Sequence, residues 1–171
     1  LGPWSAGVVC TEGLGRWAAY LAGDGQPPAP DLSVYPTVRR RGPVALVGLS
    51  SGVPKPPLFA TGTLGAAQIA AAEKLIRRVG CEIVLHGHNH RSEVARIAGP
   101  AGPVPVIGVT SASAAPGSKY GRARWHLLRI DRDADRWKID VELRALRAGG
   151  GACEPDGTLT FHMPAAPAVV P

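Results

Sequence analysis

The sequence has few aromatic residues and no apolar run long enough to cross a membrane. Phe, Trp and Tyr make up 5% of the 171 residues. The longest apolar runs, such as residues 44–49 and 104–109, fall far short of the roughly 20 residues that a membrane-spanning helix needs. We expect no signal segment at the start of the chain, because its first residues read as a turn and a buried aromatic. Because no initiator Met is present, we expect the start to belong to a longer precursor. A membrane span, a coiled coil and a collagen-like rod are excluded.

Cysteine is also scarce. Cys10, Cys81 and Cys153 stand far apart, and no C-x-x-C pair occurs. An odd count of widely spaced cysteines argues against a disulfide framework, so we expect a reduced, cytoplasmic protein. Cys81 adjoins an apolar run and is expected to be a small buried hydrophobe.

Positive charge exceeds negative charge, and the formal net charge is +6 at pH 7. Most of the excess is arginine scattered along the chain, and the one cluster is Arg39-Arg40-Arg41. We interpret this cluster as the solvated approach to a strand, with a phosphate-facing patch as the alternative. Nucleic acid is therefore not an expected partner.

The 22 glycines and 17 prolines indicate a loop-rich α/β protein rather than a helical bundle. Continuous apolar residues predict a strand buried on both faces over residues 43–49. Other strands are predicted over residues 82–86 and 104–110, over 125–130 and 137–144 as a half-exposed antiparallel hairpin, and over 159–163.

One amphipathic helix is predicted over residues 64–79, with Thr63 as its cap and Gly80 as its stop. Its apolar stripe comprises Ile69, Ala72, Leu75, Ile76 and Val79, and Gln68 lies on the polar side.

The chain is expected to form one domain over residues 1–148, followed by a Gly/Pro-rich tail over residues 149–171. Residues 1–36 form an irregular segment with Trp4, Trp17 and Tyr20 as anchors. Residues 23–28 are expected to form a flexible loop.

Three of the five histidines fall within five residues, as His86, His88 and His90. Alternate residues of an extended chain point the same way, about 6.6–6.8 Å apart at Cα, so His88 and His90 could reach into one space. Gly87 lets the backbone turn sharply where the strand ends, and strand ends of open α/β sheets bind ligands. A metal site and a polar loop with satisfied histidines are both compatible with this pattern.

The residues from Val84 to Ser92, which read Val-Leu-His-Gly-His-Asn-His-Arg-Ser, resemble the last signature of the calcineurin-like metallophosphoesterases. Residues 39–51 resemble the central strand of bacterial members, and residues 60–65 resemble the start of the following helix. Residues 106–114 and the later hairpin resemble the closing strands. The resemblance spans roughly residues 1–145.

The resemblance implies a partial four-layer α/β/β/α sandwich, with a mixed sheet and a C-terminal antiparallel hairpin. It implies a metal-dependent hydrolase that cleaves phosphate mono- or diesters with two divalent ions, Mn, Fe or Zn. His88 and His90 would each bind one ion. His86, Asn89 and Arg91 are candidates for contacts to substrate or to the ligands, and Arg91 is otherwise solvated.

The sequence departs from the family pattern upstream of this block. It has no Asp-x-His motif, Asn89 is its only asparagine, and no histidine precedes His86. Gly23-Asp24 matches the family's bridging Gly-Asp pair by letters alone, in a segment that we interpret as a linker. We therefore expect the C-terminal portion of such an enzyme, weakly active or inactive by itself. The alternative is a non-catalytic α/β module without a dimetal centre. His126 and His162 are expected to be structural or exposed.

Overall fold

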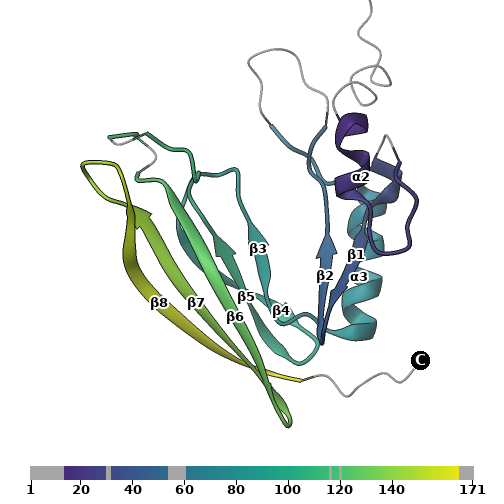
Figure 1. Ribbon diagram of the computed structural model, residues 1–171. Coiled ribbons are helices and arrows are strands. Elements are labelled where there is room, and N and C mark those ends of the chain that lie inside the picture. The colour runs from purple at the N-terminus through teal and green to yellow at the C-terminus, as the bar shows by residue number, and fades with distance from the viewer. Residues whose placement is uncertain (1–13, 30–31, 54–60, 116, 120, 166–171) are drawn as a thin grey trace, which may run out of the picture. The chain divides into compact units, whose positions relative to one another are not determined.

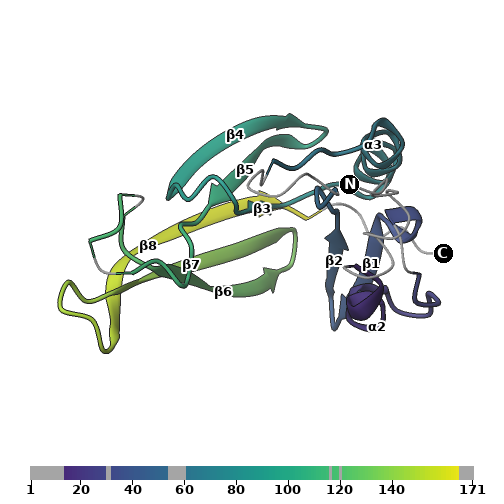
Figure 2. The same ribbon diagram turned by 90° about the horizontal axis from the view of Figure 1, so that it is seen from above.

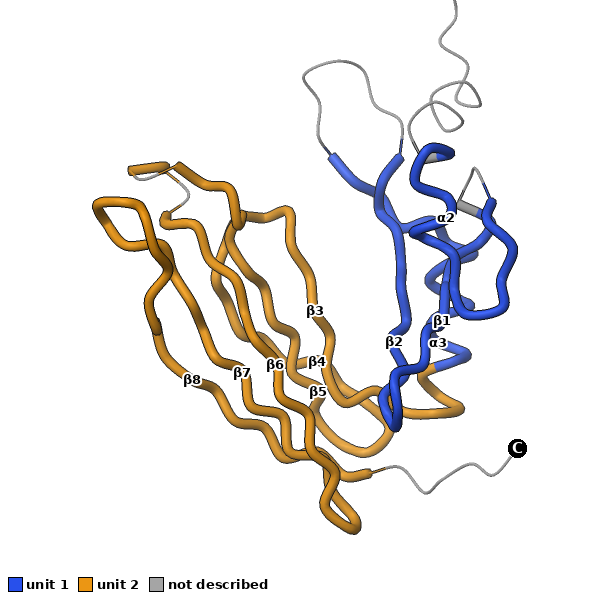
Figure 3. Tube along the Cα trace, in the orientation of Figure 1, with its two compact units in different colours: residues 1–75 blue, residues 76–171 orange. Residues whose placement is uncertain are grey.

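The computed structural model describes residues 14–29, 32–53, 61–115, 117–119 and 121–165. The chain forms two compact units, unit 1 over residues 1–75 and unit 2 over residues 76–171 (Figure 3). Trp4, Cys10, residues 54–60 and the tail from residue 166 lie outside the described residues. None of the described helices is long and apolar enough to cross a bilayer.

Unit 1 contains short helical turns, one hairpin and most of the long helix (Figure 1). In chain order these are η1 (Leu14–Trp17), α2 (Ala18–Leu21), η2 (Leu32–Val34), β1 (Thr37–Arg41), β2 (Val44–Gly48) and α3 (Ala66–Val79). The expected anchors Trp17 and Tyr20 are 61% and 71% exposed, so that expectation is wrong. Their rings contact each other instead, with centroids 6.0 Å apart.

The strand predicted over residues 43–49 is confirmed as β2, but its burial on both faces is wrong. Leu46 is 51% exposed and Val47 is 42% exposed. In the described part of the chain β2 pairs with β1 alone, and a two-stranded sheet cannot cover both faces. The arginine cluster, expected to precede a strand, is itself the end of β1 and pairs with residues 44–46.

The predicted helix is confirmed as α3, which begins two residues later than expected. Gly65 rather than Thr63 precedes the first turn, because its carbonyl accepts from the Ile69 amide. Gly80 ends the helix as predicted, with φ +84° and its N–H donating to the Ile76 carbonyl.

The apolar stripe predicted for α3 is confirmed in part: Ala72 is buried and Leu75 and Ile76 are half-buried, whereas Ile69 and Val79 are exposed. Gln68, placed on the polar side, is 6% exposed. Its amide accepts from the Ser50 N–H and donates to the Ser50 carbonyl, both at 3.0 Å. A side chain that satisfies both backbone groups of one residue is stable when buried.

Unit 2 consists of two three-stranded sheets that pack face to face as two layers (Figure 2). The mixed sheet has the order β3-β5-β4, from β3 (Val84–His86), β5 (Gly102–Gly108) and β4 (Glu93–Gly99). The antiparallel sheet has the order β6-β7-β8, from β6 (Arg124–Asp133), β7 (Arg136–Leu146) and β8 (Cys153–Pro164). The described chain is therefore mixed α/β, with a mixed sheet and a C-terminal antiparallel hairpin as predicted.

The core of unit 2 lies between these sheets. Ile107 of the mixed sheet meets Ile139, Val141 and Met163 of the antiparallel sheet, and each of the four is at most 8% exposed. The predicted alternation along β7 is confirmed, since Ile139 and Val141 face inward. β8 extends the predicted strand over residues 159–163 into the range expected as a tail. β4 was not predicted.

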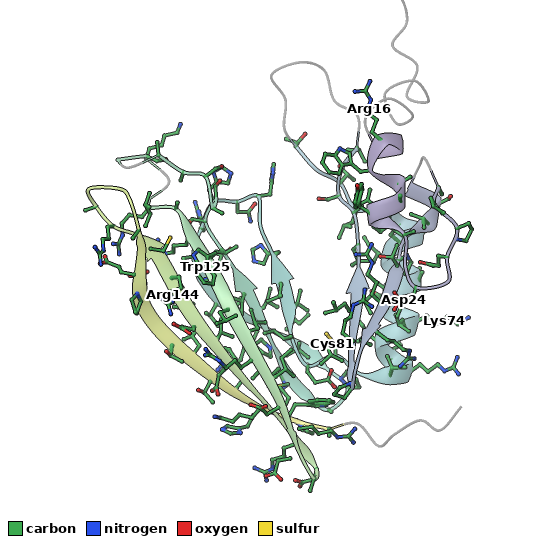
Figure 4. All side chains as sticks on the ribbon, in the orientation of Figure 1. Arg16, Asp24, Lys74, Cys81, Trp125 and Arg144 are labelled. Carbon is green, nitrogen blue, oxygen red and sulfur yellow. The ribbon has the colours of Figure 1, made fainter. Side chains whose placement is uncertain are left out.

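The outer face of the antiparallel sheet is polar and charged. Arg144 lies with its guanidinium carbon 5.8 Å from the centre of the Trp125 ring (Figure 4). Arg129 and Glu142 form an ion pair at 3.2 Å, and Thr160 donates to Asp140 at 2.6 Å. Cross-strand pairs of this kind stabilise a solvated sheet face.

Candidate functional site

Apart from His86, which ends β3, the predicted site residues lie on the loop that joins β3 to β4, residues 87–92, which we call the histidine loop. β3 and β5 are parallel, and His86 pairs with Gly108 at the last position of each strand. The histidine loop and the segment that follows β5 therefore start at the same edge of the mixed sheet. Ligands bind at the carboxyl ends of strands in open α/β sheets.

The backbone of the histidine loop is not extended. His88 has φ +76° and His90 has φ +54°, both in the left-handed region. The expectation that alternation along an extended chain aligns the two rings is therefore wrong. Left-handed non-glycine residues are uncommon and concentrate at functional sites. His88 is exposed, and His90 is half-buried.

The described residues do not by themselves form a site for resident metal ions. No three His, Cys, Asp or Glu side chains in the described ranges lie close enough together to hold one ion. A catalytic zinc site takes three protein ligands, and two close cations also need an anionic bridge to offset their repulsion. His88 and His90 would need further ligands from outside the described residues.

Asp24, which matched the family's bridging aspartate by letters, is engaged within unit 1. Its carboxylate accepts from the Arg40 N–H at 2.6 Å and pairs with Arg41 at 3.2 Å (Figure 4). The bond from the Arg40 amide is the main cause that lowers the pKa of Asp24. The Asp24 N–H donates to the Val38 carbonyl. Gly23-Asp24 is thus an anchored turn, and its interpretation as a linker is wrong.

His86 lies across Gly108 from Glu93. The His86 Nε2 is 3.8 Å from the Glu93 carboxylate. A Cβ atom added to Gly108 would lie 2.8 Å from the His86 ring and 3.0 Å from the Glu93 side chain. Glycine at position 108 therefore makes room for the histidine and the glutamate on neighbouring strands.

The histidine loop borders an open hollow that we call the basic concavity. Its volume is about 700 Å³. The residues that line it are Asn89, His90, Arg91, Ser92, Glu93, Thr110, Lys119 and Arg124. Arg91, Lys119 and Arg124 are cationic and Glu93 is the single carboxylate among them. Because cations outnumber anions on this surface, it favours an anionic ligand.

Asp156 fixes the position of Arg124. The Arg124 Nε donates to one Asp156 oxygen at 2.8 Å, and Arg122 donates to the other at 2.9 Å. These arginines lower the pKa of Asp156, and the Arg124 hydrogen bond is the largest cause. The Thr110 hydroxyl donates to the Arg122 carbonyl at 2.9 Å. Thr110 and Arg124 thus belong to one hydrogen-bonded cluster at the edge of the basic concavity.

A second hollow, the apolar cavity, lies beside the first and has a volume of about 210 Å³. It is lined by Ser92, Glu93, Val94, Ile107, Gly108, His126, Leu143 and Leu159. Burial is the main cause that lowers the pKa of His126, and the positive charge of Arg124 adds to it. The imidazole is therefore neutral at pH 7. Its Nε2 is buried and has no hydrogen-bond partner among the described residues.

Sequence reasoning named three of the eight residues that line the basic concavity. Asn89, His90 and Arg91 line the basic concavity, whereas His88 and His86 do not belong to its lining. Thr110, Lys119 and Arg124 were missed. Thr110 is the last residue of the strand predicted over residues 104–110, at the same sheet edge, which was a usable signal. Lys119 lies in the loop before β6, and Arg124 is the first residue of β6. A sequence pattern does not specify the path that brings either residue to this sheet edge.

His126 is half-buried on the inner face of β6, and His162 is exposed on β8. Cys81 is half-buried and donates to the Ile83 carbonyl. Burial raises the pKa of its thiol, in keeping with the expected small hydrophobe rather than a reactive nucleophile.

Comparison of the chain with protein-family models, curated proteins and solved structures found no match. The resemblance to calcineurin-like metallophosphoesterases therefore depends on the residues of this sequence, above all on the Gly-His-Asn-His block.

Proposed function

We propose that this chain is part of a metal-dependent phosphoesterase and binds a phosphate mono- or diester in the basic concavity. The four-layer α/β/β/α sandwich would then be the fold of the complete enzyme, and the chain alone would be weakly active or inactive. A reduced, cytoplasmic setting belongs to the proposal, supported by the free thiols of Cys81 and Cys153.

One observation carries the proposal. The histidine loop follows a strand whose parallel neighbour ends at the same edge, and it borders a surface with three cationic side chains. Phosphate carries up to two negative charges and several acceptor oxygens, so it suits guanidinium and ammonium donors. A neutral ligand would lack the negative charge that these cationic side chains favour.

The residues of the basic concavity would contribute to phosphate binding in different ways. Arg124, fixed by Asp156, presents its remaining N–H donors with little loss of freedom, and Lys119 and Arg91 add positive charge. Fixed donors aimed at phosphoryl oxygens stabilise charge that develops there during ester cleavage. Asn89 adds an amide donor at the same surface.

His88 and His90 enter the proposal through the resemblance, as one ligand each for a Mn, Fe or Zn pair whose ions would activate water and neutralise the phosphoryl oxygens. The remaining ligands would have to lie outside the described residues.

A non-catalytic α/β module is the second candidate. It is favoured by the observation that the described residues bring no three metal-ligating side chains together. Such a module could still bind a phosphorylated ligand in the basic concavity without cleaving it.

Phosphate binding is tested by titrating inorganic phosphate into the purified chain and into Arg124→Gln and Arg129→Gln. Both arginines lie on β6 in ion pairs, but only Arg124 lines the basic concavity. We expect about tenfold weaker binding in Arg124→Gln, since one charge-assisted contact is worth roughly 1.5–3 kcal/mol. Arg129→Gln should bind like the parent chain. Equal binding in all three, or none in the parent, would contradict the phosphate site.

Catalysis is tested separately, with Mn²⁺, p-nitrophenyl phosphate and bis-p-nitrophenyl phosphate, and with metal analysis of the purified chain. Turnover that is lost in His88→Ala and in His90→Ala supports the metal-ligand assignment. Turnover that survives both substitutions overturns it. A longer chain that supplies the missing ligands is measured in the same way. If both chains bind phosphate but show neither turnover nor bound metal, the non-catalytic module is favoured.

A further inference from the structure

We propose that the apolar cavity takes the organic group of the phosphate ester, so that the substrate is an ester of an aromatic or bulky aliphatic alcohol. This inference depends on the proposed function, because it assumes that the phosphate lies in the basic concavity. It adds the class of the alcohol, which the family resemblance leaves open.

The two hollows adjoin each other. Ser92 and Glu93 line both the basic concavity and the apolar cavity. They stand where the histidine loop leads into β4. A single molecule can therefore place a charged group in the first hollow and an apolar group in the second.

The size and lining of the apolar cavity fit a ring. Val94, Ile107, Leu143 and Leu159 supply its apolar walls. An engineered cavity of about 150 Å³ with such walls accepts benzene, and this one has about 210 Å³. One six-membered ring, or two fused rings that extend toward the opening, would fill it. A methyl group would leave most of it empty.

His126 gives the apolar cavity one polar contact. It reaches this space from the inner face of β6, where its Nε2 has no hydrogen-bond partner among the described residues. A neutral imidazole can donate or accept one bond at this atom. A ring bearing an ether, carbonyl or amine group would satisfy it, whereas a saturated hydrocarbon would leave it unpaired at a cost.

The test compares two phosphate monoesters of equal charge, 1-naphthyl phosphate and methyl phosphate, in calorimetric titrations of the full chain. We expect the naphthyl ester to bind about tenfold more tightly, because its ring leaves water and the phosphate contacts are the same. Inorganic phosphate serves as the reference for the charged group alone.

Two matched variants test whether the preference for the naphthyl ester comes from the apolar cavity. Val94 lines the apolar cavity and is 45% exposed, while Ile97 is 49% exposed and points to the opposite face of β4. Tryptophan at either position adds an aromatic residue to an edge strand, which tolerates it. Val94→Trp should abolish the preference for the naphthyl ester and leave methyl phosphate binding unchanged. Ile97→Trp should keep the preference.

Three results overturn the inference. If the parent chain binds both esters equally, the apolar cavity does not take the organic group, and the phosphate site stands. If Val94→Trp keeps the preference, the ring binds elsewhere. If neither ester nor inorganic phosphate binds, the proposed function fails and this inference with it. The comparison of the two esters in the parent chain needs no variant. It therefore tests whether the organic group contributes to binding even where a variant fails to fold.

Discussion

The β1–β2 and β6–β7 hairpins differ in how their apolar residues are covered. β2 in unit 1 reads Val-Ala-Leu-Val-Gly, yet Leu46 and Val47 are exposed by 51% and 42%. β7 in unit 2 alternates apolar and charged residues. Its Ile139 and Val141 are buried, with exposed fractions of 1% and 0%. The more apolar strand is thus the less buried one, because unit 2 has a second sheet to cover β7.

Different interactions therefore stabilise the two units. Among the described residues, the interior of unit 2 is a cluster of branched apolar side chains between two sheets. In unit 1, polar side chains bond to the backbone of neighbouring segments. Gln68 binds both backbone groups of Ser50, and Arg39 donates to the carbonyl oxygens of Tyr20 and Ala22. An apolar run predicts a strand, but it does not predict what will cover that strand.

The largest expected effect comes from the core of unit 2. We expect Ile139→Ala to lower the free energy of unfolding by about 2–5 kcal/mol, because it removes buried methylene groups and leaves a cavity. Leu46→Ala should cost under about 1 kcal/mol, since the side chain is already half in water. Denaturant unfolding, with amide hydrogen exchange resolved for each unit, measures both. An equal loss in Leu46→Ala would show that β2 is covered in solution, and the contrast between the hairpins would disappear.

Much of the fold could be predicted because it depends on local patterns. The 3.6-residue period and Gly80 predicted α3 almost to its ends, and strict alternation predicted the β6–β7 hairpin. β1 and β4 escaped prediction because their sequences, Thr-Val-Arg-Arg-Arg and Glu-Val-Ala-Arg-Ile-Ala-Gly, carry charge among small apolar residues. Each becomes a strand by pairing with a more apolar neighbour, which is a tertiary effect.

The site could be predicted where it follows a strand and not where it depends on loop conformation. Gly87 and the end of β3 placed the histidine loop at a sheet edge. The left-handed conformations of His88 and His90 could not be foreseen, because positive φ is uncommon for any non-glycine residue, even though histidine adopts it more often than most. Lys119 and Arg124 join the basic concavity through the packing of distant segments, which no spacing in the sequence encodes.

Gln68 offers the sharpest test of polar stabilisation in unit 1. Gln68→Ala leaves the Ser50 N–H and carbonyl without partners, and we expect a loss of about 1–3 kcal/mol in the free energy of unfolding. Lys74→Ala, at an exposed position of the same helix (Figure 4), should change it by less than about 0.5 kcal/mol. Thermal unfolding of the two variants makes the comparison. If both behave alike, Ser50 finds other partners and unit 1 does not depend on this contact.

Asp156 tests whether polar contacts also matter in unit 2. Its pKa is lowered from the usual 3.8 by its bonds to Arg124 and Arg122, so its stabilisation is fully present above about pH 4 and is lost as the pH falls through the lowered pKa. Asp156→Asn should therefore destabilise the protein at pH 7 by about 1–2 kcal/mol, a figure reduced by partial exposure. The difference from the parent should shrink as the pH falls through this lowered pKa. A difference that stays constant from pH 7 to pH 2 would mean that the carboxylate charge contributes nothing.

The smallest expected effect lies at the end of α3, where Gly80 has φ +84°. Gly80→Ala forces a side chain into the left-handed region, which costs about 1 kcal/mol. Gly149→Ala is the matched control, because a Cβ there meets no atom within 4 Å and its φ is not positive. This substitution should leave the free energy of unfolding nearly unchanged.

Hydrogen exchange of the β3 amides, a few residues after Gly80, then shows how far the strain spreads. If β3 exchanges faster in Gly80→Ala, the end of α3 unfolds together with the sheet that carries the histidine loop. If its exchange is unchanged while the helix amides exchange faster, α3 frays without affecting that sheet, and the end of the helix belongs energetically to unit 1.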